Sequence, residues 1–195
     1  MRPAPRKQFA GSPFFYLAFT LASAIVHYLL IASNACDIVE GGPRMHLYIP
    51  PAAPDSASLW SPGPLIFSYY KPFAALFRTP ATGFYTGSAL LAATLTFALL
   101  RFFANVRVPG PVLYGLGIWS VISPATVMLA ARQPHILLGI IFLLLIFIAL
   151  LRHKNLLVLV FVIHLFLTHQ ALGFLSLILL AAYLALNKKR TIWHL

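Results

Sequence analysis

The chain has 195 residues, of which 61% are hydrophobic and 9% are charged, and its formal net charge is +11. This composition indicates an integral membrane protein with a single membrane domain over residues 1–195. The basic residues are scattered between apolar runs, as they are in polytopic proteins, so the charge does not indicate a nucleic-acid partner. The single cysteine, Cys36, excludes an internal disulfide and a Cys-rich metal site.

Residues 14–32 form the first predicted span, and residues 33–82 form one long polar segment, which we interpret as an outer loop. The tail before the span carries only basic charges: Arg2, Arg6 and Lys7. The loop contains all the acidic residues of the protein: Asp37, Glu40 and Asp55. A loop of this length is usually functional or disordered.

The end of this loop, from Leu65 to Phe77, is rich in aromatic residues. Its large side chains have no soluble core of their own to enter. We therefore predict a re-entrant or interfacial helix there, with Tyr69, Tyr70 and Lys71 near the lipid headgroups.

Two further spans are predicted over residues 83–104 and 111–131. The first of them begins with Gly83-x-x-x-Gly87, a face of small residues that allows close helix packing. The second should be kinked at Pro124, because proline cannot donate the hydrogen bond that continues a helix.

The fourth predicted span, residues 134–151, has no polar side chain from Ile136 onward, so its solvent should be lipid. Pro134 suits its first turn, where a missing N–H costs nothing. The apolar stretch that follows is interrupted at Thr168–Gly173. We interpret it as two short spans, over residues 156–169 and 172–186.

The distribution of Lys and Arg favours six crossings with both termini in the cytoplasm. Six crossings place ten of these residues in inner segments and four in outer segments, whereas five crossings divide them seven to seven. The predicted fold is therefore all-α: a polytopic transmembrane bundle of about six crossings, with a re-entrant or interfacial helix in the first outer loop.

In this topology the outer face gathers every carboxylate and several polar helix ends. Seven residues there have side chains suited to phosphate or sugar: Lys71, Arg78, Arg132, Gln133, His135, His169 and Gln170. Asp37 and Glu40 are the candidate catalytic residues, because an acid beside such groups can deprotonate an acceptor or bind a divalent metal. Simpler explanations are a solvated acid, an interfacial anchor for Arg132, and hydrogen-bonded structural histidines.

The order of these features resembles the polyprenyl-phosphate-dependent GT-C superfamily of glycosyltransferases. Members place an acidic residue just after the first span, where Asp37 stands. The loop segments Trp60-Ser61-Pro62-Gly63-Pro64 and Tyr69-Tyr70-Lys71-Pro72 are similar to their Tyr/Pro-rich run into a re-entrant helix. Ser123-Pro124 and Arg132-Gln133-Pro134-His135 look like their Ser/Asn-Pro and Gly-Gln motifs, with Arg in place of Gly. Family members commonly have more spans, so this chain would be a short or truncated relative.

The resemblance implies an enzyme of the bacterial inner membrane that transfers a glycosyl group from a polyprenyl-phosphate-linked donor at the outer or lumenal face. A divalent metal is the one cofactor that this chemistry suggests. The alternative is a non-catalytic small subunit or assembly factor of a larger membrane complex, which small size and a Gly-x-x-x-Gly face also fit. A third interpretation is a transporter, or a haem protein whose haem would be bound by His27 and His164.

Overall fold

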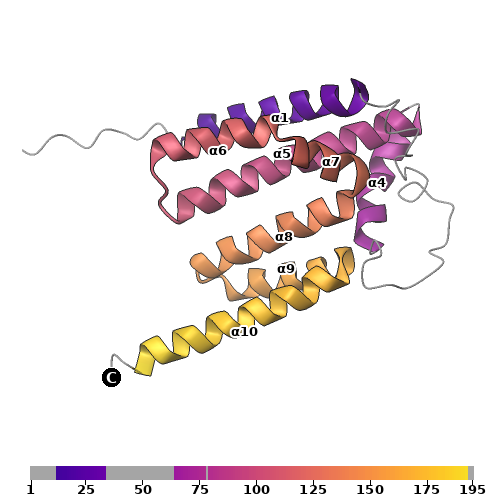
Figure 1. Ribbon diagram of the computed structural model, residues 1–195. Coiled ribbons are helices and arrows are strands. Elements are labelled where there is room, and N and C mark those ends of the chain that lie inside the picture. The colour runs from indigo at the N-terminus through magenta and orange to yellow at the C-terminus, as the bar shows by residue number, and fades with distance from the viewer. Residues whose placement is uncertain (1–11, 34–63, 78, 193–195) are drawn as a thin grey trace, which may run out of the picture.

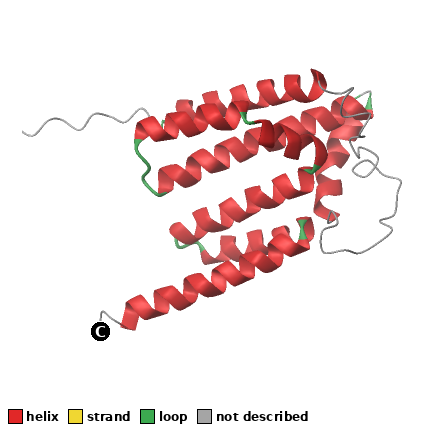
Figure 2. Cartoon of the chain, viewed as in Figure 1, coloured by secondary structure: helices red, strands yellow, loops and turns green. Residues whose placement is uncertain are grey.

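The computed structural model describes residues 12–33, 64–77 and 79–192 of the chain (Figure 1). This described part is entirely helical and contains no strand (Figure 2), which confirms the predicted all-α class. Its helices are α1 (Pro13–Ser33), α4 (Pro64–Leu76), α5 (Pro80–Asn105), α6 (Gly110–Ile122), α7 (Pro124–Arg132), α8 (Pro134–Leu151), α9 (Asn155–Thr168) and α10 (Gln170–Ile192).

The long helices lie side by side and run alternately in opposite directions, while α4 lies across one end of the bundle (Figure 1). Along the chain, α1 packs against α5, α5 against α8, α8 against α9, and α9 against α10. We call the end that α4 covers the α4 end; it includes Ser33, Pro134 and His169. The opposite end, with Asn105 and Arg152, is called the basic end.

Three described helices are long and apolar enough to cross a membrane: α1, α5 and α8. The pair α6 and α7 adds a fourth candidate span if the two are counted together. The apolar helices Asn155–Thr168 and Gln170–Ala185 are shorter. At ~1.5 Å per residue, α9 and this apolar part of α10 fall short of the ~30 Å hydrocarbon layer, although α10 itself continues to Ile192. The described residues therefore contain three to four candidate spans, fewer than the six that the sequence predicted.

The predicted kink at Pro124 is a bend of 46° between α6 and α7. Ser123 precedes the proline in an extended conformation (φ −65°, ψ 115°), as steric contact with a following proline ring favours. Its hydroxyl accepts a hydrogen bond from the Thr126 N–H at 3.5 Å and so caps α7. The segment predicted as one span is thus two helices with a capped break.

Large apolar side chains cover the outside of the bundle, whereas small polar ones lie inside it. Ile25 of α1 is 61% exposed, Leu156 of α9 is 75% exposed and Ile178 of α10 is 66% exposed. Ser23 and Thr96 are fully buried between α1 and α5, with their hydroxyl oxygens 2.9 Å apart. This distribution is compatible with an integral membrane protein, because exposed large apolar side chains on every described helix would be costly in water.

The two glycines of the Gly-x-x-x-Gly face allow α4 to lie directly on α5. A Cβ atom at Gly83 would be 2.7 Å from the backbone oxygen of Phe73, and one at Gly87 would be 2.7 Å from the ring of Tyr70. The prediction of close packing at this face is confirmed. The partner helix is the short α4.

Tyr69 and Tyr70 complete the contact between these helices. The Tyr69 hydroxyl donates to the Gly87 carbonyl at 2.8 Å, and the Tyr70 hydroxyl lies 2.8 Å from that of Ser88. Tyr70 is buried and stacks on Phe84 at 5.2 Å. The helix expected over residues 65–77 is therefore present, and both tyrosine hydroxyls bond to α5.

Candidate functional site

The predicted site residues that the structure describes come from three separate segments of the α4 end. Lys71 is exposed on α4, Arg132 and Gln133 are exposed where α7 meets α8, and Gln170 is exposed at the start of α10. Figure 1 shows these segments at the same end of the bundle. His135 and His169 lie buried at this end as well, and Asp37, Glu40 and Arg78 lie outside the described part of the chain.

The corner between α7 and α8 is formed by Gln133 and Pro134. The Gln133 N–H donates to the Leu129 carbonyl at 2.9 Å and ends α7, while Gln133 itself has left the helical conformation (φ −138°, ψ 54°). Pro134 then begins α8, as predicted. This corner leaves Arg132 and Gln133 exposed and turns His135 into the protein, where it is only 7% exposed.

His169 occupies the single-residue break between α9 and α10. Its backbone N–H donates to the Leu165 carbonyl at 2.8 Å and ends α9. Its ring nitrogen Nδ1 accepts the Leu172 N–H at 3.4 Å and caps α10. The neutral ring therefore carries its proton on Nε2. Burial lowers the pKa of His169 below the ordinary histidine value.

The rings of His135 and His169 stack on each other, 5.5 Å apart between centroids and 8° from parallel. The stack joins the first turn of α8 to the α9–α10 break, two segments that are distant in the sequence. Both rings are buried, whereas Lys71, Arg132, Gln133 and Gln170 of the same end are exposed. The sequence predicted both histidines at this face but gave no sign that they touch.

The exposed side chains in the described part of this site supply hydrogen-bond donors. Lysine, arginine and amide N–H groups bind anionic oxygens such as those of a phosphate. The described residues include no carboxylate and no group of three side chains that could hold a metal ion. A carboxylate that serves as general base or metal ligand would therefore have to come from residues 34–63, which contain all three acids.

The other two histidines that the sequence singled out bond within their own helices. His27 Nδ1 donates to the Ser23 carbonyl at 2.8 Å, in the interface between α1 and α5. His164 Nδ1 donates to the Val160 carbonyl at 2.7 Å, and its ring lies against Phe142 of α8. The two histidines thus belong to different helix interfaces.

The hydroxyl pairs inside the bundle were missed by the sequence analysis. Ser23 pairs with Thr96, and Ser88 pairs with Tyr70. The available signal was the presence of small hydroxyl side chains inside apolar spans, where they hydrogen-bond across helices.

No family model matches the chain, and no curated protein or solved structure matches it. The arrangement of the site residues is therefore the basis for a functional proposal.

Proposed function

We propose that the protein is a membrane enzyme that transfers a glycosyl group from a polyprenyl-phosphate-linked donor at the membrane face of its α4 end. The observation that supports this most directly is the gathering of Lys71, Arg132, Gln133 and Gln170 at one end of the bundle, from three segments of the chain. The first candidate acid, Asp37, follows the last residue of α1, Ser33, by only four positions.

In the proposed reaction the acceptor hydroxyl attacks the anomeric carbon and gives its proton to the carboxylate of Asp37 or Glu40. The bond from the anomeric carbon to the phosphate oxygen breaks, and its electron pair leaves with the polyprenyl phosphate. Lys71, Arg78 and Arg132 would neutralise that developing charge, and the two glutamine amides would donate to phosphate or sugar oxygens. His135 and His169 hold the surrounding helix ends in position.

The same proposal includes six crossings and cytoplasmic termini. The antiparallel arrangement of α8, α9 and α10 in Figure 1 supports it, because each helix returns the chain to the opposite end of the bundle. Basic residues of the predicted inner segments also meet at the basic end, where Arg152 of α8 donates to the Asn105 side chain of α5 at 3.2 Å. The bacterial inner membrane is the proposed location.

The proposal is tested by a pair of substitutions in the acidic segment. Asp37→Asn preserves shape and removes the charge, so it should lower lipid-linked sugar transfer by about 10²–10⁴-fold, the usual contribution of a general base. Asp55→Asn removes a charge from the same segment and should leave transfer nearly unchanged. Full activity of the Asp37→Asn protein, at equal expression, would reject the catalytic assignment.

A non-catalytic subunit is the second candidate, and the outer face of α1 favours it. Phe14, Leu17, Leu21, Ile25 and Leu29 follow each other at helical spacing and are all more than half exposed. Such a stripe suits a partner helix as well as lipid. Retention of a polyprenyl phosphate by the purified chain would favour the enzyme, and co-purification of a stoichiometric membrane protein without that lipid would favour the subunit.

A further inference from the structure

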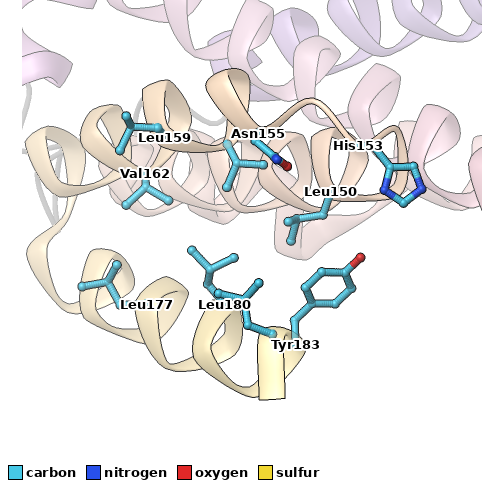
Figure 3. A pocket seen from close by; sticks show the side chains of 10 residues that line it. Leu150, His153, Asn155, Leu159, Val162, Leu177, Leu180 and Tyr183 are labelled. Atoms are coloured by element: carbon cyan, nitrogen blue, oxygen red, sulfur yellow. The ribbon is translucent and has the colours of Figure 1, made fainter. Parts of the chain in front are cut away.

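A cavity of about 440 Å³ lies between α9 and α10, toward the basic end of the bundle (Figure 3). Its volume is within the range of small-molecule sites, about 300–1,000 Å³. The cavity is separate from the proposed active site, which is at the α4 end. An inference drawn from it therefore goes beyond glycosyl transfer and does not depend on that reaction.

The lining of this cavity changes character along its length. Val162 of α9 and Leu177 of α10 lie at one end, and Leu180 lies between the helices near the middle. His153 and the hydroxyl of Tyr183 lie at the other end, as Figure 3 shows. The cavity thus has an apolar length and a polar mouth, which is the pattern of a lipid with one chain and one headgroup.

The turn between α8 and α9 holds the polar mouth in place. The Lys154 N–H donates to the Ala149 carbonyl at 2.9 Å, and His153 adopts a left-handed backbone conformation with φ 55°. Residues other than glycine rarely adopt this backbone conformation, although histidine is among the more tolerant ones. Lys154 is exposed and lies between His153 and Asn155 in the sequence, and these two neighbours line the cavity.

The described residues at the basic end of the bundle carry a net positive charge. The basic end presents Arg101, Arg107, Arg152 and Lys154, and the described residues contain no carboxylate at all. Arg101 lies 5.0 Å from the ring centre of Tyr16, and Arg152 bonds to the neutral side chain of Asn105. Phosphate groups of the adjacent membrane leaflet are the anions that lie at this depth.

We propose that the α9–α10 cavity binds one chain of an anionic phospholipid, whose phosphate lies at the mouth formed by His153 and Tyr183, beside the exposed Lys154 of the same turn. The apolar length accommodates the acyl chain, and the Tyr183 hydroxyl and the lysine ammonium donate to the phosphate oxygens. The lipid belongs to the leaflet at the basic end.

The test titrates delipidated full-length protein in detergent with phosphatidylglycerol or phosphatidylcholine of the same chains and counts bound lipids by native mass spectrometry. The parent protein should bind one phosphatidylglycerol in clear preference to phosphatidylcholine. Lys154→Gln should lower that preference about five-fold, the effect of one cation near a membrane surface. Arg107→Gln, which removes a cation from the same end but outside the cavity, should leave it unchanged.

Variants that fill the cavity without changing the charge test whether lipid binding depends on the cavity or only on surface charge. Leu180→Trp should reduce binding of both lipids while the protein keeps the parent's melting temperature; Val162→Phe fills the same space from α9 if the first variant does not fold. Equal binding of the two lipids by the parent, or unchanged binding when the cavity is filled, would overturn the proposal. If the parent protein is a dimer, and a cavity-filling substitution abolishes the dimer but leaves lipid binding unchanged, the cavity binds a second copy of the chain instead.

Discussion

The imidazole rings of His135 and His169 lie 5.5 Å apart and within 8° of parallel, although the residues begin α8 and separate α9 from α10. The contact ties the last two helices to the rest of the bundle at the α4 end. The ring of His169 is only 1% exposed, and its Nδ1 also caps α10 by accepting the Leu172 N–H. Three expectations about this region can be tested by thermal melting in detergent.

The first concerns the cap itself. His169→Ala removes the acceptor of the Leu172 N–H together with the stacked ring, and it should lower stability by about 2–4 kcal/mol, combining a lost cap with a lost buried side chain. His169→Asn keeps a side-chain oxygen in a position to accept the same N–H, and it should cost clearly less. Equal melting temperatures for the two variants would mean that the cap contributes nothing.

The second concerns pH. Burial lowers the pKa of His169, so the folded protein resists a proton that the unfolded chain accepts at about pH 6.5. Stability should be independent of this group above pH 7 and should fall as the pH drops through 6.5 toward the lowered value. Melting temperatures between pH 8 and pH 5 measure the slope. His169→Asn should reduce it, and an unchanged slope would assign the acid sensitivity to other groups.

The third concerns the contact of α4 with α5. Gly83→Ala places a Cβ atom 2.7 Å from the Phe73 backbone oxygen, and a backbone atom cannot move aside cheaply. We expect a loss of about 1–3 kcal/mol, the usual cost of overpacking. Gly115→Ala is the matched control, because a Cβ atom there meets nothing within 4 Å. That variant should be neutral or gain up to about 1 kcal/mol from helix propensity.

Local backbone chemistry could be predicted from the sequence because it depends on neighbouring residues. Pro124 predicted the bend, Pro134 predicted the start of α8, and the Thr168–Gly173 interruption predicted the break at His169. In each case the helix boundary is set locally, by a proline that lacks a backbone N–H donor or by a residue that caps a helix end. The Gly83-x-x-x-Gly87 face likewise indicated close packing, since only the absence of Cβ atoms was needed.

Pairings between distant segments could not be predicted in the same way. No property of His135 alone indicates a stack on His169, and Ser23 gives no sign of its bond to Thr96. The orientation of Tyr70 was also missed, because an aromatic residue in a loop is equally suited to headgroups and to a groove on α5. These contacts depend on how the helices are arranged, which hydropathy does not determine.

The number of crossings is decided by the side of the membrane on which the α9–α10 break lies. If α9 and α10 each cross, Gln170 is on the face opposite to Lys154; if they form a re-entrant hairpin after four crossings, both residues are reached from the cytoplasmic side. Both side chains are exposed in the structure, so each can be replaced by cysteine in a Cys36→Ser background. With six crossings, a membrane-impermeant maleimide added to intact cells should label Gln170→Cys and spare Lys154→Cys. Labelling of Gln170→Cys only in inverted vesicles would leave four spans and a hairpin inserted from the cytoplasmic side.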